Sequence, residues 1–422
     1  MPYTLFTEEN LDQALAHYKA TDVIQDVLLV CFDQHGKWRC HPFSHDGGDT
    51  GNLPQQTIPA NHLVKICTNG QKILLCSFVD SSETPIELDY HHVAGHISIA
   101  NTLHFDAPNL QTVGEFLDAH SATIFNAPDL QTVGGFLDAK AATILDVPKL
   151  KKVDGYLKAT FALTFNAPCL LTVRGDLNVF CVITLNVPCL QTVNGDLSAG
   201  NRITFDSPLI NTISSLLSVQ SPPTFRVPDL QTVDGSLAVL CANIFDAAKL
   251  QTVGGELIAV LATSFLAPSL KTVGSHLEVP LATTFYLPNL QTVDGILDAT
   301  HATIFTAPEL LTVKYSLDAG SATTFDAPNL QSVNDDLNAG SAKSFNAPNL
   351  ATVDGGLNAE SATTFDAPNL QAVNGDLNAG SAKSFNAPNL VTVDGKLILP
   401  SATLKAVLPH CPAARRKAAE TL

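Results

Sequence analysis

Five residues of two metal-binding types cluster near the N-terminus: Cys31, His35, Cys40, His41 and His45. Cysteine and histidine are common zinc ligands. The eight residues between Cys31 and Cys40 do not give the spacing of a standard zinc knuckle, and both cysteines fall in expected strands. Cys67 and Cys76 repeat this spacing. The pattern favours two pairs of buried thiols, each pair facing across a hairpin, over a zinc site.

Other thiols and imidazoles could also do chemistry. A second group of histidines comprises His91, His92, His96 and His104. A cysteine nucleophile needs a histidine and an orienting carboxamide or carboxylate that converge in space, and sequence adjacency of Cys40 and His41 does not show this. Cys169 and Cys189 stand at the same place in adjacent repeats, where we expect reduced thiols. No nucleotide-binding, serine-hydrolase or zinc-protease motif occurs. We therefore predict no catalytic residue, no cofactor and no metal site.

The third candidate is a set of acidic and amide side chains that recurs along the chain. We predict that they bind a protein partner, which a basic surface would suit. The residues are Asp176, Asn178, Asp196, Asp234, Glu256, Glu278, Asp294, Asp298, Asp336 and Asp376. The alternative is a solvated face that only keeps the protein soluble.

Composition narrows the function classes. The 422 residues contain 23 Lys plus Arg and 40 Asp plus Glu, a net charge of −17. Such an acidic balance disfavours nucleic-acid binding. The sequence has no apolar run long enough for a membrane span, and its first residues lack the features of a Sec signal peptide. With nine cysteines, an odd number, we expect a cytoplasmic protein, or one exported without a Sec signal.

The acidic and amide side chains recur because the chain contains a repeat of 20 residues. Fifteen copies run from about residue 101 to 400 without an insertion, and a degenerate copy starts near residue 81. Five positions define each copy: Phe (Phe105 onward), Pro (from Pro108), Leu (from Leu110), Val (from Val113) and a second Leu (from Leu117). Residues 321–350 and 361–390 are nearly identical, which indicates duplication of a 40-residue unit.

The repeat predicts a mainly β fold, a β-solenoid of 15–16 coils. Apolar and polar residues alternate with period 2, as in a strand with one buried face. Val113, Glu115 and Leu117 would then point inward, with Phe116 and Asp118 outward. Proline in nearly every copy marks a corner and excludes a helix. Gly at ten of fifteen positions equivalent to Gly135 indicates close backbone approach. Asp or Asn at positions equivalent to Asp106 would either cap turns, which we favour, or stack as a polar ladder.

The string Leu-x-x-Val-x-Gly-x-Leu, as in residues 190–197 and 230–237, resembles leucine-rich-repeat proteins, and most closely their receptor L-domain variant. The resemblance covers about residues 81–400. It implies a solenoid that recognises a protein or ligand on a sheet face. The chain departs from the family because a Phe-x-Ala-Pro corner replaces the helix and no cysteine-rich module is present.

The two ends are not repetitive. Residues 1–80 predict a small α+β capping unit, with a helix from about Thr7, a hairpin over 27–41 and a second over 63–78 around Asn69-Gly70. Residues 81–400 form the solenoid, and 401–422 a cap with a short helix from Pro412. Exposed solenoid edges invite aggregation, so capping is the minimal role of both ends. The sequence leaves the oligomeric state open.

Two alternative functions remain. The N-terminal segment could carry an enzymatic or toxin-like activity on a solenoid stalk. The chain could also be a structural, surface- or ice-binding rod, because Thr recurs at positions equivalent to Thr112. A second threonine position, equivalent to Thr123, is interrupted by Leu, Ile, Pro, Asn and Lys, which disfavours a flat ice-binding face.

Overall fold

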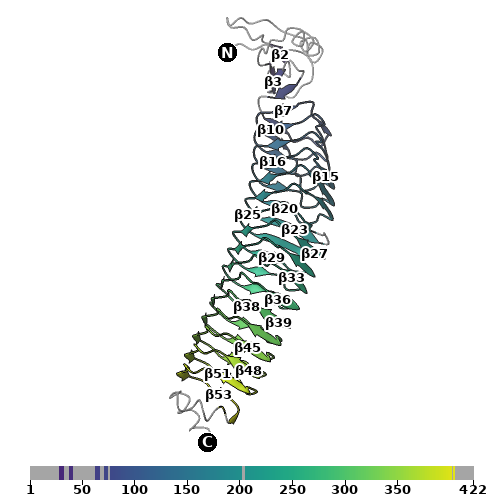
Figure 1. The fold of residues 1–422 in the computed structure, drawn as a ribbon. Helices are drawn as coiled ribbons and strands as arrows, with labels where there is room; N and C mark the ends of the chain where they lie inside the picture. The colour runs from purple at the N-terminus through teal and green to yellow at the C-terminus, as the bar shows by residue number, and fades with distance from the viewer. Residues whose placement is uncertain are drawn as a thin grey trace, which may run out of the picture. The chain divides into compact units, whose positions relative to one another are not determined.

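The computed structural model describes residues 28–32, 38–40, 62–66, 71–74, 77–201, 205–401 and 403. The chain divides into two compact units, Met1–Gly195 and Asp196–Leu422. Each unit is a stack of short parallel strands, as Figure 1 shows. The expected helices, from about Thr7 and from Pro412, lie outside the described residues.

Two antiparallel hairpins precede the coils of the first unit. β1 (Leu28–Phe32) pairs with β2 (Trp38–Cys40), and β3 (His62–Ile66) pairs with β4 (Lys72–Leu74), which confirms both expected hairpins. The predicted facing of Cys31 and Cys40 is wrong, because Cys31 lies opposite Arg39 and Cys40 opposite Val30. Cys67 and Cys76 lie outside the described residues.

The second hairpin is joined to the solenoid by strand pairing. β4 pairs in parallel with β7 (His92–Val93), and β5 (Phe78–Asp80) pairs in parallel with β8 (Ile97–Ile99). These rungs are 19 residues apart, so the degenerate first coil is one residue shorter than the rest. The hairpin strands therefore continue a solenoid sheet at its N-terminal edge.

Each regular coil has three short strands, each on its own face. The first complete coil places β9 (His104–Asp106) on the first face, β10 (Thr112–Val113) on the second and β11 (Leu117–Asp118) on the third. Within each unit most strands pair in parallel with the strand 20 residues onward, for example Phe105 with Phe125, whereas the first-face strands at 264–266 and 284–286 belong to separate sheets. About sixteen such coils occur across the two units, which confirms the predicted β-solenoid.

The remaining strands of the first unit follow the same order. They are β6 (Ile86–Glu87), β12 (Ile124–Asn126), β13 (Thr132–Val133), β14 (Leu137–Asp138), β15 (Ile144–Asp146), β16 (Lys152–Val153), β17 (Leu157–Lys158), β18 (Thr164–Asn166), β19 (Thr172–Val173), β20 (Leu177–Val179), β21 (Thr184–Asn186) and β22 (Thr192–Val193).

The second unit repeats this order on its three faces. Its first-face strands are β24 (Phe205–Asp206), β27 (Thr224–Arg226), β30 (Ile244–Asp246), β33 (Ser264–Leu266), β36 (Thr284–Tyr286), β39 (Ile304–Thr306), β42 (Thr324–Asp326), β45 (Ser344–Asn346), β48 (Thr364–Asp366) and β51 (Ser384–Asn386). Its second-face strands are β25 (Thr212–Ile213), β28 (Thr232–Val233), β31 (Thr252–Val253), β34 (Thr272–Val273), β37 (Thr292–Val293), β40 (Thr312–Val313), β43 (Ser332–Val333), β46 (Thr352–Val353), β49 (Ala372–Val373) and β52 (Thr392–Val393). Its third-face strands are β23 (Leu197–Asn201), β26 (Leu217–Ser221), β29 (Leu237–Val239), β32 (Leu257–Ile258), β35 (Leu277–Glu278), β38 (Leu297–Asp298), β41 (Leu317–Asp318), β44 (Leu337–Asn338), β47 (Leu357–Asn358), β50 (Leu377–Asn378) and β53 (Leu397–Ile398).

The core consists of the predicted apolar positions stacked on themselves. In one coil the buried set is Ala302, Phe305, Ala307, Leu310, Val313, Leu317 and Ala319, each 0% exposed. Phenylalanine rings of neighbouring coils stack face to face, with 4.9 Å between the centroids of Phe305 and Phe325. The buried side chains of successive coils thus form a continuous core within each unit, which no single coil could form alone.

The prediction that Glu115 points inward is wrong. Val113 and Leu117 are buried, but Glu115 is exposed. A two-residue bend, at residues 114 and 115 in this coil, separates the second-face strand from the third-face strand. The bend interrupts the alternation at Glu115 only, so one continuous strand with period 2 does not form.

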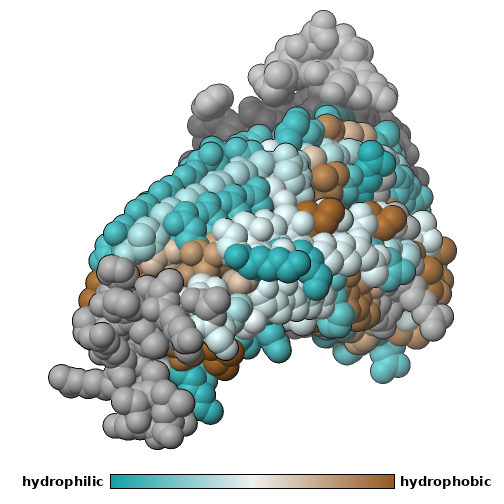
Figure 2. Space-filling view, turned by 60° about the horizontal axis from the view of Figure 1, so that its bottom comes forward, coloured by the Kyte–Doolittle hydropathy of each residue, from teal (hydrophilic) through white to brown (hydrophobic). Residues whose placement is uncertain are grey.

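Segments of a polar ladder lie on the first face, at positions equivalent to Asp106, and are interrupted where that position holds Arg226, Leu266, Tyr286 or Thr306. Asn126 Nδ2 donates to Asp106 Oδ1 at 2.5 Å, and Asn346 Nδ2 donates to Asp326 Oδ1 at 2.6 Å. These bonds link side chains 20 residues apart. The favoured turn-capping role is therefore wrong for these residues, and the stacked ladder is correct. Figure 2 shows continuous hydrophilic rows on the surface, with apolar side chains at scattered places.

Candidate functional site

The ten predicted binding residues lie on or next to the third face, and none of them is buried. They occupy three outward rows. The bend row, the residue after each second-face strand, contains Asp234 and Asp294. The pre-strand row, the residue before each third-face strand, contains Asp176, Asp196, Glu256, Asp336 and Asp376. The strand row, the second residue of each third-face strand, contains Asn178, Glu278 and Asp298.

Carboxylates of the pre-strand row have a structural task that the sequence did not reveal. Asp336 Oδ1 accepts the backbone N–H of Gly356, and Asp376 Oδ1 accepts that of Lys396, both at 2.6 Å. Asp196 Oδ1 accepts the N–H of Leu216 at 3.0 Å. Each carboxylate thus binds the residue of its own row in the next coil. This bond fixes the side chain against the backbone.

The strand row forms a second wall of fixed side chains. Asn338 Nδ2 donates to Asp318 Oδ1, and Asn358 Nδ2 donates to Asn338 Oδ1, each at 3.1 Å. The same Asp318 Oδ1 accepts the N–H of Gly320 at 2.8 Å, which closes the following turn. Asn178 and Asp298 accept the amide two residues onward in the same way, at 3.3 and 3.0 Å. Short polar side chains are suited to such turns.

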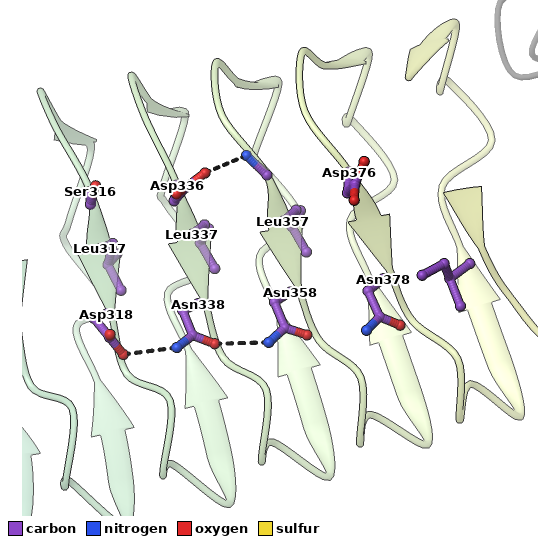
Figure 3. Close-up of a pocket in the computed structure, with 12 residues that line it drawn as sticks. Ser316, Leu317, Asp318, Asp336, Leu337, Asn338, Leu357, Asn358, Asp376 and Asn378 are labelled. Atoms are coloured by element: carbon purple, nitrogen blue, oxygen red, sulfur yellow. Dashed lines mark hydrogen bonds between the residues drawn. The ribbon is translucent and has the colours of Figure 1, made fainter. Parts of the chain in front are cut away.

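A groove of about 520 Å³ lies between these two walls in the second unit. Figure 3 shows the pre-strand row on one side and the strand row with its hydrogen-bonded ladder on the other. The lining residues are Ser316, Leu317, Asp318, Asp336, Leu337, Asn338, Gly356, Leu357, Asn358, Asp376, Asn378 and Ile398. Gly356 opens the space between Asp336 and Asp376, because it has no side chain.

The groove contains only two of the ten predicted residues, Asp336 and Asp376. Asp318, Asn338 and Asn378 line it too and share the same alternation in sequence. Sequence analysis missed Ser316 and Gly356, whose small size makes the groove. One feature of the sequence could have indicated this region. Residues 321–350 and 361–390 are nearly identical, so the same outward side chains recur 40 residues, or two coils, apart.

The other eight predicted residues lie outside this groove. Asp176 and Asn178 belong to the first unit, and Asp196 lies at the start of the second. Asp294 Oδ2 forms an ion pair with Lys314 Nζ at 2.9 Å. Asp234, Glu256, Glu278 and Asp298 occupy coils before the groove.

Acidic side chains outside the groove are often neutralised by bases of adjacent coils. In the second unit Lys249 pairs with Asp229, and Arg226 with Asp246. Within the part of the chain that the structure describes, Asp318, Asp336 and Asp376 form no ion pair. The groove therefore presents carboxylates that form no ion pair among the described residues, with the exposed Lys396 as the next pre-strand residue beyond Asp376.

The second histidine group makes local contacts. His92 Nδ1 lies 2.7 Å from Thr112 Oγ1, and His96 Nδ1 lies 2.9 Å from Ser77 Oγ. Burial, and then the nearby His91, lowers the pKa of His92. Among the described residues, no three potential ligands converge as a metal site would require. The side chains of Cys31, His35, Cys40, His41 and His45 lie outside the described set.

The second threonine row uses its hydroxyls inside the protein. Thr303 Oγ1 donates to the carbonyl of Thr283, and Thr323 Oγ1 to that of Thr303, both at 2.9 Å. These hydroxyls satisfy backbone acceptors of the preceding coil. The threonine side chains themselves are exposed at the surface.

No protein-family model matches the sequence, and no curated protein is significantly similar to it. Among the described residues, no helix is long and apolar enough to cross a membrane.

Proposed function

We propose that this chain is a non-enzymatic repeat scaffold that binds a basic protein segment in the third-face groove of its second unit. The observation that carries the proposal is the pair Asp336 and Asp376, which line the groove without an ion-pair partner among the described residues. Charge complementarity of this kind favours Lys or Arg on the partner.

The fixed walls of the groove add to this argument. The hydrogen bonds of Asp336 and Asp376 to the backbone hold Oδ1 of each carboxylate, and Oδ2, which has no hydrogen bond or ion pair among the described residues, can meet a partner. A rigid, preorganised surface loses little conformational entropy on binding. The resemblance of the repeat to leucine-rich-repeat proteins also supports recognition on a sheet face.

The spacing of the carboxylates suggests the conformation of the bound segment. Asp336 and Asp376 stand two coils apart, which is about 9.6 Å at a strand spacing of ~4.8 Å. A polyproline II segment rises about 9.3 Å over three residues and returns to the same face. A segment with a basic residue at every third position would therefore meet both carboxylates.

Peptide selection on the immobilised full-length chain tests the proposal. We expect enriched peptides to carry Lys or Arg three residues apart. Asp336→Asn with Asp376→Asn keeps both hydrogen-bond acceptors and removes two charges, so it should abolish enrichment. The matched control is Asp354→Asn with Asp394→Asn, which removes two charges from the bend row of coils at the groove. Enrichment without basic residues, or equal loss in both double variants, would contradict the proposal.

A further inference from the structure

Two free cysteines stand one above the other in the first unit. Cys169 is exposed and Cys189 is half-buried. Each follows the corner proline of its coil, inside a turn closed by equivalent hydrogen bonds, Leu170 N–H to Ala167 O and Leu190 N–H to Val187 O. The strands on either side are in register, with Asn166 opposite Asn186 and Thr172 opposite Thr192. The two cysteines therefore occupy the same place in adjacent coils.

Side chains of this row contact each other from coil to coil elsewhere in the chain. The ammonium of Lys149 lies 2.7 Å from Asp129 Oδ1, and that of Lys249 lies 2.7 Å from Asp229 Oδ1. Asn349 Nδ2 donates to Asn329 Oδ1 at 3.2 Å, and the same bond joins Asn109 to Asp89 at 3.0 Å. The row thus directs successive side chains toward one another.

Coil spacing suits a covalent link at this place. Neighbouring strands lie about 4.7–4.9 Å apart, and disulfides form across Cα separations of about 4.4–6.8 Å. We propose that Cys169 and Cys189 form a redox-sensitive modification site, which a low-molecular-weight disulfide converts into a cross-coil disulfide.

The chemistry is thiol–disulfide exchange. The exposed thiolate of Cys169 attacks a sulfur of the small disulfide, forms a mixed disulfide and releases one small thiol. The thiolate of Cys189 then attacks the Cys169 sulfur and releases the second small thiol. The two protein thiols are oxidised, and the small disulfide is reduced to two thiols. Each protein thiol gives up its proton, and each departing thiolate takes one.

Cys181 supplies a control within the same unit. It is half-buried and free, but the equivalent residues of adjacent coils are Phe161 and Asn201. With no cysteine beside it in its row, Cys181 has no resolving thiol there. Exchange at Cys181 should therefore stop at the mixed disulfide.

Peptide mapping of the folded full-length chain after incubation with oxidised glutathione tests the proposal, once remaining thiols are alkylated. We expect a Cys169–Cys189 linked peptide, about 2 Da lighter than the two reduced peptides together, and a glutathione adduct at Cys181. In Cys189→Ser, Cys169 should instead carry glutathione. Separate glutathione adducts on Cys169 and Cys189 in the wild type, or alkylation of both while Cys181 reacts, would overturn the proposal.

Discussion

The pre-strand row has opposite chemistry in one stretch of each unit. In the first unit the row from Phe116 to Tyr156 is a stack of rings, in which the centroids of Phe116 and Phe136 lie 4.6 Å apart and those of Phe136 and Tyr156 4.5 Å. In the second unit the same row holds Ser316, Asp336, Gly356 and Asp376, and a groove lies beside it. The rows therefore share a backbone position and differ in what fills the surface.

The inward neighbours of both rows are alike. Leu137 in the first unit and Leu337 in the second follow the row directly, and they are 0% and 1% exposed. The core positions thus maintain the coil whatever stands outside. A solenoid can therefore vary the chemistry of one outward row without changing its fold.

The largest expected loss of stability comes from substituting a buried core residue. Phe325 is fully buried, and its ring stacks on Phe305 and Phe345 at 4.9 Å. Phe325→Ala should lower the free energy of unfolding by about 3–5 kcal/mol, because it removes buried area and leaves a cavity. Chemical denaturation followed by circular dichroism measures this loss. A loss as small as that of an outward substitution would break the contrast between core and surface.

Two adjacent glycines should respond differently to the same substitution. A Cβ on Gly355 would come within 2.7 Å of the Asp335 carbonyl carbon and the Asp336 nitrogen, whereas a Cβ on Gly356 meets nothing closer than 3.4 Å. Gly355→Ala should therefore cost about 1–3 kcal/mol through overpacking, and Gly356→Ala much less. Denaturation midpoints of the two variants give the comparison. Equal midpoints would show that close coil approach does not select glycine here.

Sequence predicted the inward side of the molecule well. Strict recurrence of Phe, Leu and Val every 20 residues is enough to specify stacked coils, because each apolar position must meet its own kind. The bend at Glu115 was missed because two residues of bend leave the parity of the flanking positions unchanged. The offset of Cys31 from Cys40 depends on hairpin register, which equal sequence spacing does not determine.

The outward side was predicted less well. The sequence identified the acidic residues. It did not show their contacts, because these depend on the size and charge of the side chain in the next coil. Asp336 lines a groove because Gly356 follows it in the row, whereas Asp294 is neutralised by Lys314. Such outcomes depend on pairs of outward residues rather than on a recurring position.

A smaller effect should separate the structural task of the groove carboxylates from their charge. Asp376→Ala removes the acceptor for the Lys396 amide and should cost about 0.5–1.5 kcal/mol. Asp376→Asn keeps an acceptor and should cost less. Denaturation of both variants at equal ionic strength measures the difference. If Asn costs as much as Ala, charge rather than hydrogen bonding stabilises this position.

The smallest expected effect is the pH dependence that Tyr156, in the pre-strand row of the first unit, adds to stability. Burial, then the charges of Asp138 and Asp118, raises the pKa of Tyr156 above its usual value of 10.0. Because the folded-state pKa is raised, the stability that this tyrosine contributes is present below pH 10 and is lost as pH rises through the folded pKa. Ultraviolet titration of wild type against Tyr156→Phe isolates the Tyr156 phenolate. Asp138→Asn should lower the Tyr156 midpoint, and an unchanged midpoint would exclude this electrostatic cause.

The most direct test transfers the chemistry of the first unit into the second. Gly356→Tyr places a ring in the pre-strand row between Asp336 and Asp376, without removing either charge. Fluorescence anisotropy would measure the affinity of the full-length wild type and variant for a peptide with Lys at every third residue. We predict an unchanged coil fold by circular dichroism and at least about a tenfold loss of affinity, or ~1.4 kcal/mol. Unchanged affinity in the folded variant would contradict binding in the groove.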